Sequence, residues 1–415
     1  MGSRVAIVGA GYAGMAAAVA LARRGVAATV FESGPVPGGR ARRVRIQDEE
    51  YDNGQHILIG AYAELLGMMR AVGVPADAVL RVPLELRYAD GFALRSLWLP
   101  QPLGLLGGLL AARRLPLAEG LRAARFALAM RKCGFRLPAD MAVSELLRRH
   151  GQEGGAGRYL WRPLCTSALN TPPEMASANV FLGVLRDSVW GEREASDLLL
   201  PRRDLSRLFP EPAAEFLRAH GGELRTGVPV RDLAALRQEF ARVVVAVGPH
   251  QLKPLLPELA PDFAYQPIYT CYLQYPAGVR LPFPMLGLAD GLVQWAFDRG
   301  ALSGERGRIA CVISAQGDHQ QMQQDELAAN CHRELARALR DLPPPERAQV
   351  IAEKRATIAA TPGLRRIGPQ TPVPGVFVAG DYTDGEYPPT LEAAVRSGLR
   401  AAALVQGAAS AGSLR

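Results

Sequence analysis

The stretch VAIVGAGYAG at residues 5–14 combines a short apolar run with three closely spaced glycines. An apolar run of this kind is typical of a buried parallel strand. In a strand-to-helix turn, the first glycine permits the turn, the second lets the backbone approach a phosphate, and the third allows close packing; here they are Gly9, Gly11 and Gly14. A second apolar run, residues 28–31, ends at Glu32, where an acid can accept hydrogen bonds from ribose hydroxyl groups. The stretch therefore predicts a dinucleotide-binding strand–helix–strand unit.

A second turn of this type is predicted near the C-terminus, where VAGD at residues 378–381 precedes PTLEAAVRSG at residues 389–398. This pattern also indicates a strand that leads through a loop into a helix. Because the first backbone N–H groups of a helix have no partner within it, a helix N-terminus favours an anion. Two such ends in one chain predict a long anionic cofactor held at both ends, and the second end would contribute Gly380, Asp381, Thr390 and Leu391.

A glycine pair followed by arginine comes shortly after Glu32, as Gly38, Gly39 and Arg40. These residues suit a pyrophosphate that is held from the side opposite the first turn. A solvated basic loop is the alternative interpretation. Together with the C-terminal turn, the segment favours FAD over NAD as the cofactor, and Asp381 is then expected to accept hydrogen bonds from the ribityl hydroxyl groups.

The segment YDNGQH follows at residues 51–56. Together with the Gly-Gly-Arg segment, it resembles the flavin amine oxidase and carotenoid desaturase superfamily. The resemblance implies that this segment passes close to the isoalloxazine ring, which makes Gly54, Gln55 and His56 expected cofactor contacts. It also implies that backbone atoms of Val228 touch the adenine.

Three further groups of phrases occur in the middle of the chain: GQHILIGAY at 54–62, LWRPL at 160–164 with NTP at 170–172, and ASDLLLP at 195–201 with DLS at 204–206. They are similar to the squalene-associated FAD-dependent desaturases, the hydroxysqualene dehydroxylases of bacterial squalene and hopanoid synthesis. The similarity extends to about residue 405; one departure is PPTLEAA at 388–394, where PATMEGA is expected. The resemblance implies that reduced flavin delivers hydride to hydroxysqualene, an allylic alcohol, and that a long isoprenoid is the substrate.

The distance between the two turns predicts that the domains are interleaved. We expect an α/β fold in which a Rossmann-like FAD-binding domain, with a parallel sheet that is discontinuous in sequence, comprises residues 1–75, 201–250 and 361–415. An α+β substrate-binding domain would comprise residues 76–200 and 251–360.

The candidates for catalysis are fewer and less specific. His56, Glu386 and Tyr387 are candidate groups near the ring, and an imidazolium of His56 could protonate a leaving hydroxyl group. A histidine that only hydrogen-bonds the cofactor or the backbone is the favoured alternative. Aromatic side chains could line a tunnel and stabilise positive charge, although buried aromatic residues more often form plain core; the candidates are Trp161, Trp190, Trp295 and Tyr387.

Composition indicates a cytoplasmic globular enzyme. The chain has 415 residues and five cysteines without a CxxC pair or metal-ligand spacing, so we expect reduced thiols and no metal site. The net charge of +8 is compatible with nucleic acid or an anionic membrane. No nucleic-acid-binding motif is evident and the basic residues are dispersed, so a membrane surface is the preferred partner.

One segment, residues 96–132, supports that preference. Residues 96–112 are uncharged and flanked by Arg95, Arg113 and Arg114, but they are too short and too rich in proline and glycine for a spanning helix. Residues 117–132 read as a basic amphipathic helix, with Leu121, Phe126, Leu128 and Met130 as its apolar residues. An interfacial segment on the inner membrane and a buried helical hairpin are equally compatible with this pattern.

Two other functions compete with the one that the resemblance implies. A carotenoid-type desaturase or isomerase would use the same fold with flavin as oxidant. A prenyl-lipid carrier would bind lipid without redox chemistry, but both flavin phrases are complete here, which argues against it. An amine oxidase is a weaker interpretation, because nothing indicates an aromatic cage for an amine. The electron donor that reduces the flavin is not indicated by the sequence.

Overall fold

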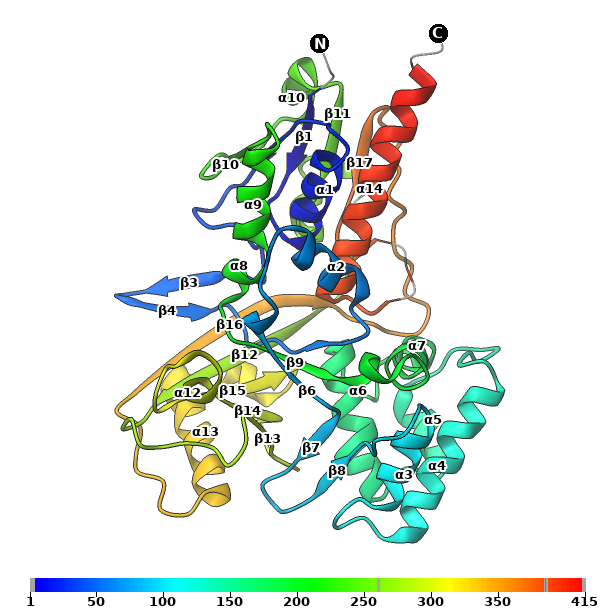
Figure 1. Cartoon of the computed structure of the whole chain (residues 1–415), viewed down its shortest axis with the longest axis vertical. Coiled ribbons are helices and arrows are strands. Elements are labelled where there is room, and N and C mark those ends of the chain that lie inside the picture. The colour runs from blue at the N-terminus through cyan, green and yellow to red at the C-terminus, as the bar shows by residue number, and fades with distance from the viewer. Residues whose placement is uncertain (1–3, 260–261, 384, 386, 413–415) are drawn as a thin grey trace.

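The computed structural model describes residues 4–412 except 260–261, 384 and 386 (Figure 1). Five parallel strands form the sheet in the upper part of the figure, in the order β10-β2-β1-β11-β17. Their bounds are β1 (Val5–Val8), β2 (Ala28–Phe31), β10 (Glu223–Arg225), β11 (Arg242–Val245) and β17 (Val376–Val378). Three separate parts of the chain thus contribute to one parallel sheet, and the predicted fold class is confirmed.

Helices cover both faces of this sheet because the strands are apolar on both faces. Val5 and Ile7 of β1 pack in the core that contains one helical layer, whereas Ala6 and Val8 pack in the core on the opposite face. The first layer consists of α1 (Tyr12–Ala22), α2 (Ala63–Ala71), α9 (Pro210–Ala219) and α14 (Leu391–Gly412). The opposite face is covered by α10 (Leu233–Glu239) and α11 (Pro249–Leu252).

A second, antiparallel sheet lies below the first, in the order β13-β14-β15-β12-β16 (Figure 1). Its strands are β12 (Tyr265–Gln274), β13 (Met285–Gly287), β14 (Trp295–Asp298), β15 (Arg308–Ser314) and β16 (Arg347–Ile358). Helix α13 (Gln324–Ala338) packs on one face with Leu327 and Leu335, and the short helix α12 (Arg299–Ser303) follows β14.

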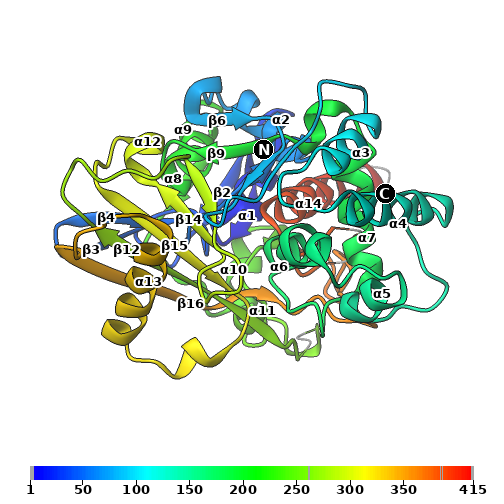
Figure 2. The same cartoon turned by 90° about the horizontal axis from the view of Figure 1, so that it is seen from below.

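Five further helices form a lobe beside this sheet. They are α3 (Leu103–Leu110), α4 (Leu117–Lys132), α5 (Val143–Arg149), α6 (Arg162–Leu169) and α7 (Ala178–Val189), and they follow the hairpin of β7 (Glu85–Arg87) and β8 (Ala93–Arg95). One hydrophobic core joins helical residues such as Phe126 and Trp161 to Met285 and Trp295 of the sheet. Figure 2 shows the sheet and the helical lobe on opposite sides of α1 and α14.

Small sheets and the short helix α8 (Leu205–Leu208) connect these parts. Strands β3 (Arg43–Ile46) and β4 (Glu49–Asp52) form a hairpin, and β9 (Leu198–Pro201) pairs with both β5 (Leu58–Ile59) and β6 (Val79–Val82). Strands β5 and β6 lie on either side of the predicted domain boundary at residue 75, so that boundary passes through a single three-stranded sheet.

Candidate active site

One continuous cavity of about 1080 Å³ extends from the carboxyl ends of β1 and β2 to the space between the antiparallel sheet and the helical lobe. Pockets for small ligands usually measure ~300–1,000 Å³. At one end the cavity is lined by the glycine turns of the parallel sheet. At the other end it is lined by apolar side chains such as Leu105, Trp161 and Met285. We call these two parts the cofactor end and the inner end.

Backbone atoms form the floor of the cofactor end. The Gly38 N–H group donates to the Ala10 carbonyl over 2.9 Å, which places the glycine pair beside the first turn. A Cβ atom on Gly39, whose φ is +63°, would lie 3.2 Å from Gly11 Cα, whereas a Cβ on Gly11 would meet no atom closer than 3.8 Å. Gly11 thus opens into the cavity, and the cradle fits a pyrophosphate group that a side chain here would displace.

Two other glycines of the first turn are required by packing. A Cβ atom on Gly14 would lie 2.0 Å from the Gly9 carbonyl oxygen, and one on Gly9, whose φ is +104°, would lie 2.5 Å from the Ala246 carbonyl oxygen. Gly9 lines the cavity but Gly14 does not. Gly14 therefore acts through the close packing of α1 on the sheet.

Glu32 lies at the cavity wall at the end of β2. Its carboxylate accepts hydrogen bonds from the backbone N–H groups of Ala10 and Gly34, both over 2.8 Å. These bonds hold the two neighbouring loops and leave carboxylate lone pairs for a ribose. Val228 also lines the cavity, and its N–H group donates to the Glu32 carbonyl over 2.9 Å. The structure thus brings these two expected contacts together.

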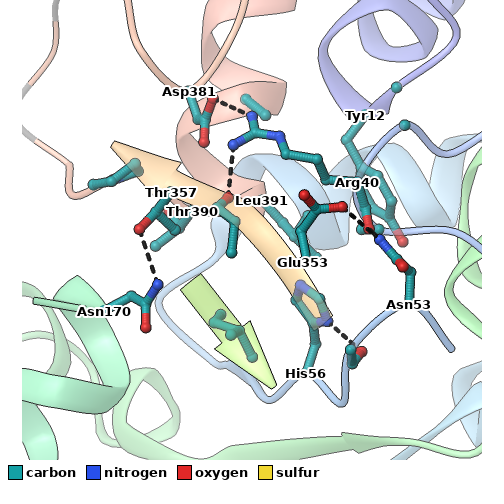
Figure 3. Close-up of a pocket in the computed structure, with 18 of the residues that line it drawn as sticks. Tyr12, Arg40, Asn53, His56, Asn170, Glu353, Thr357, Asp381, Thr390 and Leu391 are labelled. Carbon is teal, nitrogen blue, oxygen red and sulfur yellow. Dashed lines mark hydrogen bonds and ion pairs between the residues drawn. The ribbon is translucent and has the colours of Figure 1, made fainter. Parts of the chain in front are cut away.

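An ion pair joins the two distant halves of the cofactor end. Arg40 Nη2 lies 2.6 Å from Asp381 Oδ1, and its Nη1 donates to the Ala356 carbonyl over 2.7 Å (Figure 3). Burial acts to lower the pKa of Arg40, but Asp381 and, to a smaller extent, Glu353 together raise it above its ordinary value. Arg40 is therefore charged, and it links the Gly-Gly-Arg segment to the C-terminal turn.

The N-terminus of α14 forms the adjoining wall. Thr390 and Leu391 line the cavity, and Thr390 Oγ1 accepts a hydrogen bond from the Ala393 N–H group over 3.2 Å. Gly380 also lines the cavity, and its N–H group donates to Ser397 Oγ over 2.9 Å. Glu392 is fully buried and instead accepts from the first N–H groups of α2, so its role is to cap that helix.

Gly54, Gln55 and His56 lie between the two ends of the cavity. His56 Nδ1 is 2.8 Å from the Gly54 carbonyl oxygen (Figure 3), so Nδ1 carries a proton and Nε2 is the acceptor in the neutral ring. Burial, with a smaller contribution from Arg40, lowers the pKa of His56. The geometry favours the hydrogen-bonding role over the acid role. Gln55 Oε1 accepts from Arg299 over 2.9 Å.

Only two of the four tunnel candidates line the cavity. Trp161 and Trp295 do so, with Trp161 Nε1 bonded to Gln152 and Trp295 Nε1 bonded to Ser167, both over 2.9 Å. The expectation is wrong for Trp190, which packs on Phe135 at a centroid distance of 5.1 Å.

Tyr387 likewise lines a separate small cavity beside α7 and not the large one. Burial and then the neighbouring Asp187 raise its pKa to about 12, and Arg396 lies 4.4 Å from its ring centroid. These contacts explain why the side chain does not reach the inner end. Glu386 lies outside the described residues.

Several polar residues at the cavity are absent from the sequence prediction. Asn53 Nδ2 donates to Glu353 Oε2 over 2.9 Å, and Asn170 Nδ2 donates to Thr357 Oγ1 over 3.1 Å (Figure 3). In the sequence, Asn170 was distinguished only by its place in the NTP motif at residues 170–172. Its φ of +44° at the end of α6 is a conformation that asparagine adopts more readily than most residues. Glu353 and Thr357 lie on β16, where nothing in the sequence distinguishes them.

Segment 96–132 is partly buried and partly exposed. Helices α3 and α4 pack together, with Leu105, Leu109, Phe126 and Met130 buried. Eight of the nine exposed large hydrophobic residues of the described chain lie in this segment, where α4 also exposes basic side chains. The eight are Leu97, Trp98, Leu99, Leu103, Leu110, Leu117, Leu121 and Leu128. We call these eight residues the apolar patch. Across the described residues, no helix has the length and apolar character needed to span a bilayer.

Comparison with known proteins places this geometry in context. The family model described as flavin containing amine oxidoreductase matches residues 12–406. Proteins named hydroxysqualene dehydroxylase from Sinorhizobium fredii and Rhodopseudomonas palustris are each 29% identical to the chain, over 97% and 98% of it and 98% and 99% of their own lengths. They confirm the similarity predicted from the sequence. A probable zeta-carotene desaturase from Synechococcus elongatus is 23% identical over 96% of the chain and 98% of its own length.

Solved structures share the fold. A putative protoporphyrinogen oxidase from Exiguobacterium superposes with a TM-score of 0.69 at 16% identity, covering 98% of this chain and 99% of that one. Putrescine oxidase bound to putrescine gives a TM-score of 0.69 at 18% identity, with the same coverage. At these identities the likeness concerns the fold alone.

Proposed function

Because the chain belongs to the flavin containing amine oxidoreductase family and is an FAD-dependent oxidoreductase, we propose that it reduces hydroxysqualene to squalene. The observation that carries the proposal is the continuity of the cavity. The same cavity runs from the glycine cradle to an inner end lined by leucine, tryptophan and methionine side chains. A long isoprenoid is the kind of ligand that such an inner end would bury favourably.

In the proposed reaction, the C–O bond of the allylic alcohol breaks and a C–H bond forms at the same carbon. One hydride and one proton are consumed, and the products are the hydrocarbon and water. Reduced FAD, when bound, supplies the hydride and its two electrons. An external two-electron donor must then reduce the flavin again for the next turnover.

The residues of the chain contribute binding, orientation and exclusion of water. The cradle of Gly11 and Gly39, together with the Arg40–Asp381 ion pair, would hold the cofactor across the carboxyl edge of the parallel sheet. Apolar side chains at the inner end exclude water from the reacting carbon, and the faces of Trp161 and Trp295 favour positive charge that develops there.

The apolar patch would give such a lipid a route into the protein. Exposed arginines, including Arg113, Arg114 and Arg125, flank the patch and would meet anionic headgroups. Trp98, with 80% of its surface exposed, is a residue type that favours the membrane interface. We propose that segment 96–132 lies on an anionic bilayer without spanning it, as a peripheral association on the cytoplasmic side of the inner membrane.

A carotenoid-type desaturase is the second candidate, favoured by the full-length similarity to the probable zeta-carotene desaturase. It would use the same cavity with oxidised flavin. The higher identity to the hydroxysqualene dehydroxylases favours the reductive reaction.

Anaerobic mixing of photoreduced enzyme with hydroxysqualene tests the proposal directly. We expect the flavin to be reoxidised without oxygen and squalene to be extracted, with deuterium from flavin N5 at the former carbinol carbon. Squalene containing no deuterium would contradict direct hydride delivery. Insertion of double bonds into phytoene or squalene by the oxidised enzyme would favour the desaturase instead.

A further inference from the structure

Two hydroxyl groups of the cavity wall are each held as acceptors by an N–H group of a neighbouring side chain. Thr357 Oγ1 accepts from Asn170 Nδ2 over 3.1 Å, and Ser167 Oγ accepts from Trp295 Nε1 over 2.9 Å. Both hydroxyl groups belong to residues that line the cavity. A hydroxyl group has one proton, and an oxygen that accepts from N–H retains this proton for donation elsewhere.

The direction of both hydrogen bonds is fixed by their surroundings. The indole N–H group of Trp295 can only donate. The amide of Asn170 is oriented by its backbone neighbours, because its Oδ1 accepts from the Ala315 N–H group over 2.8 Å and its Nδ2 faces the carbonyl oxygens of Gln266 and Pro267 at 3.3 Å. Nδ2 is therefore the atom that faces Thr357, and Thr357 is the acceptor (Figure 3).

Neither hydroxyl proton has an acceptor among the described residues. Among the hydrogen bonds between described residues, Thr357 and Ser167 take part through these side-chain oxygens only as acceptors. The residues that carry these two donors belong to a cavity wall that also includes Leu164, Ile268 and Val312. A polar group placed in such a wall needs a partner of matching chemistry.

The two donors are also positioned by the same short region. Ser167 lies in the last turn of α6, and Asn170, which orients Thr357, follows that helix directly. The end of α6 therefore positions one hydroxyl directly and the other through an amide.

We propose that Thr357 and Ser167 form a subsite that recognises the oxygen of an alcohol substrate by donating hydrogen bonds to it. The inference rests on the proposed function and deepens it, because it names the residues that distinguish the alcohol from the hydrocarbon product. The substrate oxygen loses its hydration in an apolar cavity, and the two donors replace that hydration. The hydrocarbon offers them no acceptor, so release of the product is favoured once water has left.

Substrate binding can be measured separately from the reaction by using the oxidised holoenzyme, whose flavin has no hydride to deliver. Flavin absorbance would be followed while hydroxysqualene or squalene is added in detergent micelles. We expect Thr357→Val to weaken alcohol binding by roughly 3–10-fold, the worth of one neutral hydrogen bond, while squalene binding is unchanged. Thr357→Ser keeps the hydroxyl and should retain the wild-type preference. Ser167→Ala should weaken alcohol binding by a similar factor.

The variants are expected to fold, because in Thr357→Val the Asn170 amide keeps its two carbonyl acceptors, and melting curves would verify this. An undiminished preference for the alcohol in both Thr357→Val and Ser167→Ala would overturn the subsite. A flavin spectrum altered before any lipid is added, together with an unchanged preference, would assign Thr357 to the cofactor and also overturn it. Wild-type enzyme without any preference for the alcohol would instead overturn the proposed function, and the subsite with it.

Discussion

The cofactor end of the cavity is built mainly from backbone, whereas the inner end is built from side chains that belong to distant elements. At the cofactor end, Gly11 and Gly39 approach each other within the first forty residues, and local glycines determine the shape. At the inner end, Trp161 comes from the helical lobe and Trp295 from the antiparallel sheet. The first region depends on the absence of side chains, and the second depends on which side chains the tertiary fold brings together.

The largest expected effect comes from adding a side chain to the backbone cradle. Gly11→Leu should abolish retention of FAD, because its side chain would project into the space expected for the pyrophosphate. Flavin absorbance per mole of purified protein measures the effect. Gly368→Leu is the matched control, because a Cβ atom at Gly368 meets no atom within 4 Å. A Gly11→Leu protein with full FAD content would contradict the assignment of the cradle.

The next effect tests whether the cofactor end depends on the long-range ion pair between Arg40 and Asp381. Arg40→Met should lower the free energy of unfolding by roughly 3–5 kcal/mol, because it leaves the buried Asp381 carboxylate without its partner. Chemical denaturation of the holoenzyme measures this loss. The Asp381→Asn variant and the double variant complete a cycle, in which the double variant should cost less than the two single changes added together. Strict additivity would show that the pair contributes no coupling.

A smaller effect concerns the outer face of the helical lobe. The triple change Trp98→Ser, Leu103→Ser and Leu117→Ser should weaken binding to vesicles of anionic lipid by about 10–100-fold, because apolar area is no longer buried in the interface. Co-sedimentation at several salt concentrations measures it, with the flavin spectrum as a check of folding.

Two single arginine substitutions test whether vesicle binding depends on where the charge lies. Arg125→Gln on α4 should weaken vesicle binding slightly, by about 1 kcal/mol, whereas Arg218→Gln on the exposed surface of α9 should not. Equal effects of the two changes would indicate attraction through net charge, and not through the apolar patch and its flanking arginines.

The smallest effect is expected at His56, which lies where the two ends of the cavity meet. Burial holds the pKa of its imidazole below its ordinary value, so the ring is mainly neutral at pH 7 and above. A protonated His56 as the acid would make the rate of flavin reoxidation fall about tenfold per pH unit in this range. We expect no such fall from this group. His56→Asn, whose amide can still donate to the Gly54 carbonyl, should remain within about tenfold of the wild-type rate.

The difference between the two ends explains what the sequence could predict. The turns around Gly11 and Gly380 are local patterns with fixed spacing, so the parallel sheet and its interleaved order followed from them. The inner end has no such pattern. Thr357 became a candidate only when β16 brought it beside Asn170, and Tyr387 was a poor candidate because its side chain lies beside Asp187 of α7. Contacts of this kind depend on tertiary packing that periodicity does not reveal.

Segment 96–132 was predicted from the sequence only in part. Its uncharged composition indicated an unusual surface, but periodicity did not tell which leucines face outward. The structure buries Leu105 and Leu109 and exposes Leu103 and Leu110 on the same helix. The choice is made by the neighbours of α3, since a Cβ atom on Gly108 would lie 2.5 Å from the Arg95 carbonyl oxygen. That face of the helix is pressed against the preceding chain.

The position of helix α3 bears on which substrate concentration determines the turnover rate. Its Leu105 lines the cavity while its Leu103 belongs to the apolar patch, so the wall between the inner end and the outside is one helix thick, about 10 Å. Under the proposed function, a lipid would cross this distance without passing through bulk water. Turnover would then follow the mole fraction of hydroxysqualene in the bilayer and not its total amount per volume of solution. Diluting the vesicles at constant lipid composition should leave the rate per bound enzyme unchanged.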